Sequence, residues 1–185
     1  MNEEDGKVTK KKALMLFTDL LLCILLVWFD QFTKGLAISH LKGRSAYSLI
    51  DGVLELQYLE NHGMAFGMLQ NQKVFILFVG VIFMLVLLFF LLKMPATGKF
   101  QAIHVMMVFI ISGGLGNMLD RMRLDYVVDF IYFVLINYPI FNVADIYVTC
   151  ATAVFVVAIL FYYKEEDFAF LSIRQKMQRT PNYKD

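Results

Sequence analysis

Two aspartates in the sequence have the surroundings that acid–base chemistry requires. Asp129 lies in the stretch YVVDFIYF and Asp145 in FNVADIYV, and neither has a basic residue three or four positions away. Burial disfavours the charged form of a carboxyl group, and two carboxylates brought together do not both ionise easily. One of them then keeps a proton while the other acts as a base, as in aspartic proteases. Asp129 and Asp145 are therefore the candidate catalytic pair.

Other polar residues pair at helical spacing, so that the members of each pair share one helix face. These pairs are Asp30 with Lys34, Asn117 with Arg121, and Asn142 with Asp145. An ionisable group in a membrane helix usually faces the bundle or water and indicates function, because exposing it to lipid is costly. A second interpretation stays open for Asp30 with Lys34, and for Asp120 with Arg121 or Arg123: ion pairs at helix ends that serve structure alone.

The elements that position these residues are predicted to be membrane helices. The chain is 59% hydrophobic and 18% charged, which is too apolar for a soluble domain. Four apolar segments are each long enough to cross a hydrocarbon core of about 30 Å. We predict an all-α membrane protein, a single integral-membrane domain over 1–185 with four transmembrane helices. Their predicted bounds are about 13–34, 74–92, 102–121 and 142–163.

The connection after the first helix is predicted to contain a strand. Residues 53–59, VLELQYL, alternate apolar and polar side chains after the turn signal Asp51-Gly52. We expect a small outer β region at about 47–70. The following ENHGMAFGML holds Asn61, Gly63 and Gly67, which favour a tightly turning backbone close to another group, although an ordinary loop fits the pattern equally well.

The basic residues predict the orientation. Eleven of the 17 lysines and arginines precede the first helix, join the second to the third, or follow the fourth. The positive-inside rule therefore places both termini in the cytoplasm, with a cytoplasmic tail at 164–185. The polar residues above then converge at the outer leaflet. The first segment starts like a secretion signal, but its long apolar core and lack of a small-residue cleavage pattern predict that it is retained.

Several features predict no chemistry. A net charge of +1 gives no indication of nucleic-acid binding. Cys23 and Cys150 lie inside predicted helices, where thiols usually pack as small apolar groups, so we expect neither a disulfide nor a metal site. Asp19 lies eleven residues before Asp30 on the same helix face and points into the bundle, where His104 is a candidate partner. A structural polar contact is the simplest interpretation of this pair.

Five motifs in order, DQFTK, ENHGMAFG, GGLGNMLDR, VVDF and FNVAD, resemble the lipoprotein signal peptidase family, also called signal peptidase II. The resemblance extends from about Leu22 to Tyr163. It implies a bacterial inner-membrane enzyme that removes the signal peptide from a diacylglyceryl-modified prolipoprotein, just before the lipid-bearing cysteine. It also implies an outer β-cradle, corresponding to the predicted strand region.

By motif match, Asp129 and Asp145 become the catalytic pair, and a set of substrate-binding or supporting residues surrounds them. This set consists of Asp30, Lys34, Asn61, Gly63, Asn117, Asp120, Arg121 and Asn142. From their positions, Asn61 and Asn142 are candidate orienting groups, and Arg121 is a candidate for fixing the loop that presents Asp129. The chemistry of paired aspartates requires no metal or other cofactor.

Three alternatives fit less well. The Ser and His pair of a serine protease would be Ser112 and His104, which lie eight residues and about 12 Å apart on one helix. A presenilin-like protease would carry an aspartate directly after Gly-x-Gly, whereas Asp120 lies four residues past Gly116. A small four-helix carrier or channel with an outer-leaflet polar site is the main non-enzymatic alternative. Its polar groups would usually lie near the bilayer midplane in repeated halves, and no repeat is visible.

Overall fold

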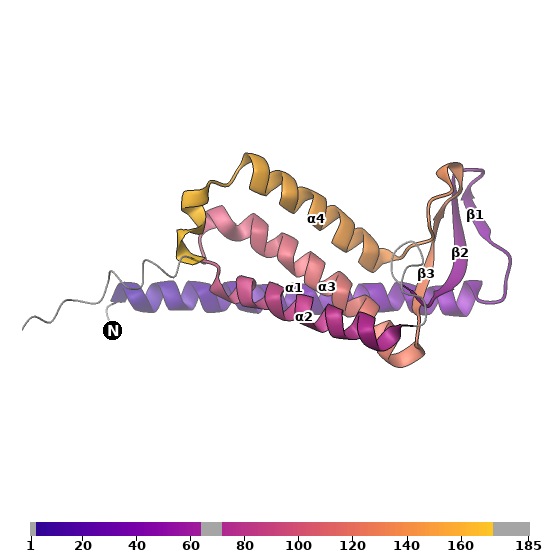
Figure 1. Cartoon of the computed structure of the whole chain (residues 1–185), viewed down its shortest axis with the longest axis horizontal. Coiled ribbons are helices and arrows are strands. Elements are labelled where there is room, and N and C mark those ends of the chain that lie inside the picture. The colour runs from indigo at the N-terminus through magenta and orange to yellow at the C-terminus, as the bar shows by residue number, and fades with distance from the viewer. Residues whose placement is uncertain (1–2, 64–71, 172–185) are drawn as a thin grey trace, which may run out of the picture.

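The computed structural model describes residues 3–63 and 72–171, and in this part of the chain four helices are long and apolar enough to cross a membrane. They are α1 (Glu3–Leu41), α2 (Lys73–Lys93), α3 (Gln101–Leu124) and α4 (Val143–Phe161). The strands are β1 (Tyr47–Ile50), β2 (Leu54–Asn61) and β3 (Val127–Phe133). They form one antiparallel sheet, ordered β1-β2-β3, at one end of the helix bundle (Figure 1). The protein is thus mostly helical, with a small sheet at one end.

Helix α1 extends beyond the predicted 13–34 at both ends. It has 39 residues, because no proline interrupts the lysine-rich start or the stretch after Lys34. At about 1.5 Å per residue it is roughly twice as long as a hydrocarbon core is thick. Gly43, at φ 72°, takes the left-handed conformation in the turn that follows the helix.

Helix α3 is the central helix. In the most apolar 18-residue stretch of α3, half of the residues are buried, against 11% in the corresponding stretch of each of the other three helices. Gly113 explains how closely α4 approaches: a Cβ there would lie 2.5 Å from the Ala144 carbonyl oxygen and 2.7 Å from Val148 Cγ2. Any larger residue at this position would force the two helices apart.

Strand β3 carries Asp129 and was not predicted. Its β-branched and aromatic residues are a strand signal, but Val127 to Phe130 are all buried, so the alternation that identified β2 is missing. Asp125, at φ 72°, ends α3 and turns the chain into β3. In the β2–β3 register Leu59 lies opposite Asp129 and Asn61 opposite Val127. Asn61 and Asp129 are therefore diagonal neighbours on one face of the sheet.

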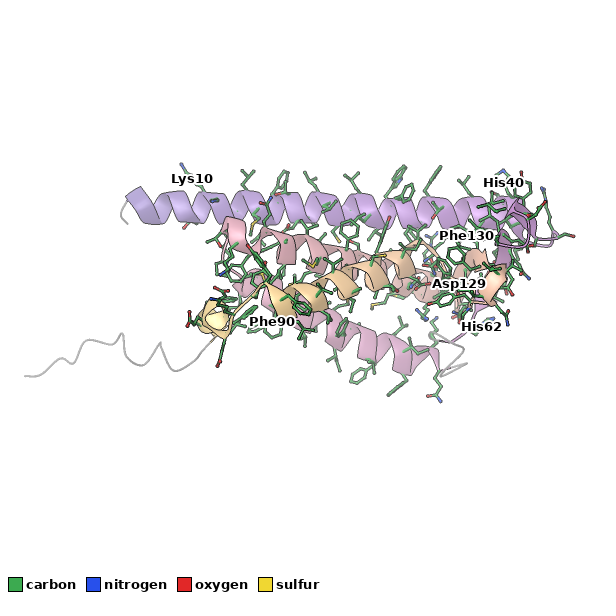
Figure 2. All side chains as sticks on the ribbon, turned by 90° about the horizontal axis from the view of Figure 1, so that it is seen from above. Lys10, His40, His62, Phe90, Asp129 and Phe130 are labelled. Atoms are coloured by element: carbon green, nitrogen blue, oxygen red, sulfur yellow. The ribbon has the colours of Figure 1, made fainter. Side chains whose placement is uncertain are left out.

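Helix α2 packs on α3 along a single narrow stripe. Its less exposed apolar residues lie on one face, at Ile76, Leu77, Gly80, Met84, Leu87 and Leu91. Figure 2 shows α2 diverging from the rest of the bundle toward the end where Asp129 lies. The part of α2 nearest the sheet is therefore separated from α4.

The end of the bundle opposite the sheet is closed by aromatic side chains. Phe100 of the 3₁₀ helix η2 (Gly98–Phe100) stacks on Tyr163 at a centroid distance of 5.7 Å. Phe168 of η4 (Glu165–Leu171) packs edge-on against Phe100. Another 3₁₀ helix, η3 (Val134–Ile136), follows β3. Residues 64–70 of the predicted β region, Gly67 among them, and the tail beyond 171 lie outside the described residues.

Candidate active site

The two candidate catalytic residues meet where β3 approaches the start of α4. Asp129 is almost fully buried, and Asp145 lies in the first turn of α4. Asn142 connects them: its Nδ2 donates to Asp129 Oδ1 at 2.6 Å, and its backbone N–H donates to Asp145 Oδ2 at 3.1 Å. Two carboxyl groups that belong to different elements are thereby held by one residue, Asp129 by the side chain of Asn142 and Asp145 by its backbone.

The second oxygen of Asp129 is held from β2. Asn61 Nδ2 donates to Asp129 Oδ2 at 2.8 Å, and Asn61 Oδ1 accepts the N–H of Gly63 at 3.0 Å. Arg121 Nη2 donates to the Gly63 carbonyl at 2.6 Å. Arg121 therefore fixes the turn after β2, and this hydrogen-bonded path connects it to Asp129 through Gly63 and Asn61. This differs from its predicted contact with the loop that presents Asp129.

The second oxygen of Asp145 is held from α3. Asn117 Nδ2 donates to Asp145 Oδ1 at 2.8 Å. The carbonyl oxygen of the same side chain accepts from Asn142 Nδ2 at 3.1 Å and from Lys34 Nζ at 2.8 Å. Asn117 thus joins the pair of aspartates to α1.

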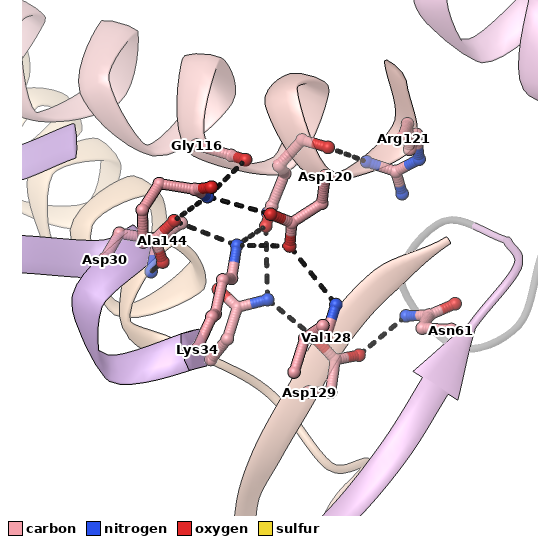
Figure 3. A network of polar contacts seen from close by, with 12 residues as sticks. Asp30, Lys34, Asn61, Gly116, Asp120, Arg121, Val128, Asp129 and Ala144 are labelled. Atoms are coloured by element: carbon pink, nitrogen blue, oxygen red, sulfur yellow. Dashed lines mark hydrogen bonds and ion pairs between the residues drawn. The ribbon is translucent and has the colours of Figure 1, made fainter. Parts of the chain in front are cut away.

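Lys34 is the centre of a buried ionic network (Figure 3). Besides Asn117, its Nζ contacts Asp30 Oδ2 and Asp120 Oδ2, both at 2.9 Å. All three charged side chains are at most 3% exposed. Asp120 is therefore paired with Lys34, and not with Arg121 or Arg123 as one sequence-based interpretation had it. Two carboxylates around one ammonium group, fully out of water, form a rigid connection between α1 and α3.

This network reaches the catalytic pair through backbone groups. Asp120 Oδ2 accepts the N–H of Val128 at 3.2 Å, one residue before Asp129. Asp30 Oδ1 accepts the N–H of Ala144 at 3.0 Å, one residue before Asp145. Asp30 and Asp120 therefore set the positions of the two chain segments that carry the candidate catalytic residues.

Gln31 and Gly116 belong to this network and were not among the predicted site residues. Gln31 Nε2 donates to Asp120 Oδ1 at 2.8 Å and contacts Asp30 Oδ2 and the Gly116 carbonyl, both at 3.2 Å. Gly116 leaves room for Asp30, since a Cβ there would overlap the Asp30 carboxylate. Gln31 lies inside the motif DQFTK. Within that motif only Asp30 and Lys34 were predicted as site residues, because they are charged and spaced i,i+4, and Gln31 has neither property.

Burial and the neighbouring carboxylate change the acidity of Asp129. Loss of water around the side chain, and then the charge of Asp145, raise the pKa of Asp129 to about 7. Hydrogen bonds from Asn61 and Asn142 act in the opposite direction because they stabilise the ionised form. Near neutral pH, Asp129 is therefore able to carry a proton.

Both aspartates line a cavity of about 1080 Å³ between α2, α3, α4 and the sheet. Of the ten predicted site residues, five face this cavity: Asn61, Asn117, Arg121, Asp129 and Asp145. The other five lie behind it: Asp30, Lys34, Gly63, Asp120 and Asn142. In the part of the chain that the structure describes, no three His, Cys, Asp or Glu side chains are placed to hold a metal ion.

Two solved structures resemble this fold. Both are titled bacterial membrane enzyme structures obtained by the in meso method, one at 2.3 Å and one at 1.9 Å resolution. The first has a TM-score of 0.71 at 29% identity, covering 80% of this chain and 92% of the other. The second has a TM-score of 0.69 at 30% identity, covering 79% and 94%.

The fold and the site define the class: a multi-pass membrane protein with the paired carboxylates of an aspartic peptidase. The signal peptidase II family model matches residues 22–161. Lipoprotein signal peptidases of Streptococcus pyogenes serotypes M5 and M18 are 36% identical over 145 residues, which is 78% of this chain and 92% of each relative. The chain belongs to the signal peptidase II family.

Proposed function

We propose that the protein is an aspartic endopeptidase that removes signal peptides from diacylglyceryl-modified prolipoproteins, cutting just before the lipid-bearing cysteine. The observation that carries this proposal is the sharing of Asn142 between Asp129 and Asp145 at the wall of a large, mostly apolar cavity. Family membership also favours the peptidase over the carrier.

The surroundings of the two carboxyl groups support a different role for each. Asp129, whose pKa is raised to about 7, keeps the proton in the resting enzyme. Asp145 lies at the N-terminus of α4, where the helix dipole favours negative charge, and it is the base. Arg121, on the cavity wall, adds positive charge beside the pair.

The reaction follows from these roles. Asp145 takes a proton from a water molecule as the water oxygen bonds to the scissile carbonyl carbon, while Asp129 gives its proton to the carbonyl oxygen. The tetrahedral intermediate then collapses and the C–N bond breaks. Asp145 passes its proton to the leaving amine, and Asp129 recovers a proton from the intermediate's hydroxyl group. Both carboxyl groups return to their starting states without a covalent intermediate.

The bundle is proposed to lie with both termini in the cytoplasm and the sheet at the outer leaflet. The distribution of basic residues supports this orientation. Single cysteines placed at the exposed residues Ser45 and Thr97 test it: a membrane-impermeant thiol reagent added to intact cells labels the first and not the second. The background is a variant without Cys23 and Cys150. Labelling of both cysteines from one side contradicts the orientation.

The function is tested by comparing one precursor peptide with and without its diacylglyceryl group. Purified protein in detergent or liposomes should cut the lipidated peptide before the modified cysteine and leave the unmodified peptide intact. Equal cleavage of both peptides would mean that the enzyme does not recognise the lipid group. Cleavage of neither would favour a carrier or scaffold.

A further inference from the structure

The contact between α2 and α3 beside the cavity is built from two methionines and two glycines. Met118 of α3 lies over Gly80 of α2, so that a Cβ on Gly80 would stand 3.4 Å from Met118 Sδ. Met84 of α2 lies over Gly114 of α3, where a Cβ would meet Met84 Sδ and Cε at 3.1 Å. The contact is reciprocal, because each helix contributes one glycine and, four residues further on, one methionine. We name these four residues the Met–Gly seam.

The Met–Gly seam is also part of the cavity wall. All four residues line the cavity that contains Asp129 and Asp145. They lie within the apolar membrane-spanning parts of α2 and α3. Phe83 on the same wall is about half exposed on the outside of α2, so this wall continues onto the lipid-facing surface of the protein.

A seam of this composition has an adjustable shape. Methionine has three rotatable side-chain bonds and a polarisable sulfur, and it adapts to irregular neighbours. Glycine leaves open the space that those rotations need. Elsewhere α3 is packed tightly, as at Gly113, whose nearest neighbours include the α4 backbone. The space beside the catalytic pair is therefore set by the ends of two flexible side chains.

The chemistry of the wall indicates what occupies it. Beyond Asn117 and Asp145, on the side away from the sheet, Thr149 carries the one polar side chain among the residues that line the cavity. An extended peptide at this depth would leave N–H and C=O groups without partners, whereas a hydrocarbon chain has none to satisfy. A helical segment is about 10–12 Å wide with its side chains, and rotation of one methionine changes the space only by the size of a few methyl groups. Changes of that size discriminate between hydrocarbon chains.

We infer that the Met–Gly seam contacts an acyl chain of the substrate's lipid group and determines which chain lengths the enzyme accepts. This inference rests on the proposed function. Met84 and Met118 close the space beside the catalytic pair. Because Gly80 and Gly114 have no side chains, the ends of the two methionines lie against the facing helices rather than in the cavity.

Substitutions on the two sides of one contact are expected to act in opposite directions. Met84→Ala removes part of the wall and enlarges the cavity. Gly114→Ala pushes the end of Met84 toward the cavity, because a flexible side-chain end yields more easily than a helix backbone. Met118→Ala should likewise enlarge the cavity, whereas Gly80→Ala should change it little, because a Cβ at Gly80 would stand at an ordinary contact distance of 3.4 Å from Met118 Sδ.

The experiment measures kcat/KM for two synthetic precursor peptides that differ only in carrying dimyristoyl- or distearoyl-glyceryl on the cysteine. Met84→Ala should raise the ratio of long-chain to short-chain cleavage by about three- to tenfold, and Gly114→Ala should lower it by a similar factor. Gly35→Ala is the matched control, because a Cβ at Gly35 meets no atom within 4 Å. The ratio of long-chain to short-chain cleavage by Gly35→Ala should equal that of the unmodified protein.

The outcomes separate this inference from the proposed function. If the variants change cleavage of both precursors equally, or shift the ratio in the same direction, the seam only packs α2 on α3 and the inference falls. If Gly114→Ala does not fold, Met118→Ala decides the same question: it should raise the ratio of long-chain to short-chain cleavage as Met84→Ala does, while Gly80→Ala should leave the ratio nearly unchanged. If the unmodified protein cuts neither precursor, the proposed function itself is wrong.

Discussion

Asn142 and Asp145 cap each other at the start of α4. Asn142 Oδ1 accepts the N–H of Asp145 at 3.0 Å, and Asp145 Oδ2 accepts the N–H of Asn142 at 3.1 Å. This reciprocal pair is a capping box, which normally stabilises a helix N-terminus. Here one partner is the proposed base, and the other also donates to Asp129. The same few atoms therefore begin a helix and hold the catalytic pair.

The two tasks of Asn142 are separable by mutation. Asn142→Ser keeps an N-cap oxygen but loses the amide that donates to Asp129 and Asn117. We expect nearly unchanged thermal stability in detergent and a loss of cleavage of about a hundredfold or more. Asn142→Ala should lose the activity and also about 1 kcal/mol of stability. Equal stability losses in the two variants would contradict a separate capping role.

Replacing either catalytic aspartate should stop the chemistry without preventing folding. Asp129→Asn and Asp145→Asn keep the shape of the side chain but remove the acid–base group, so precursor cleavage should fall by about three orders of magnitude or more. The double variant should be little worse than either single one, because the two groups act as a unit. Binding of the lipidated precursor, measured alongside, should persist.

Asp125→Asn is the matched control for the two aspartates. Asp125 is a neighbouring carboxylate whose ion-pair partner is Lys73, and it is not among the described residues that line the cavity. Its loss should leave cleavage nearly unchanged. Substantial cleavage by a folded Asp129→Asn or Asp145→Asn variant would rule out the aspartic mechanism.

The pH dependence of cleavage should report the proton on Asp129. Because this proton is lost as the pH rises through a pKa of about 7, the rate should fall above neutral pH. Asn61 donates to the ionised carboxylate and lowers its pKa, so Asn61→Ala should raise that pKa and move the falling limb to higher pH. If the rate of Asn61→Ala falls at the same pH as that of the unmodified protein, or at a lower pH, a group other than Asp129 causes the fall.

Lys34 should contribute far more to stability than the exposed Lys42. Lys34→Met leaves Asp30 and Asp120 buried without a counter-charge, and should cost about 3–5 kcal/mol of unfolding free energy. Lys42→Met breaks a half-exposed pair with Glu60 and should lower the stability far less than Lys34→Met does. Adding Asp30→Asn and Asp120→Asn to Lys34→Met should recover part of the loss, as measured by thermal unfolding in detergent. No recovery would mean that shape, rather than charge, dominates there.

Asp19 and His104 form a second polar contact between α1 and α3. His104 Nδ1 lies 2.9 Å from Asp19 Oδ2, with both side chains buried. Asp19→Asn keeps an acceptor and should lower the thermal midpoint by about 1–3 °C, with turnover of the folded enzyme unchanged. Loss of turnover at full stability would give this pair a role beyond packing.

The sequence by itself determined the features that depend on near neighbours in the chain. These features are local patterns with direct physical consequences. They are the four apolar segments of bilayer length, the alternation in β2, and the i,i+4 spacing of Asp30 and Lys34. The apolar context of Asp129 and Asp145 was also readable, because burial and charge follow from adjacent residue types.

Tertiary structure decided which of these residues meet. Lys34 forms an ion pair with Asp120 and donates to Asn117, and Arg121 donates to the Gly63 carbonyl. Strand β3 pairs with β2 although its residues do not alternate. The two halves of the Met–Gly seam likewise lie on different helices. Such choices depend on distances between residues far apart in the chain, which are fixed only when the helices pack. Local patterns therefore predicted the four helices, β2 and the candidate acid–base pair, and packing assigned each polar group its partner.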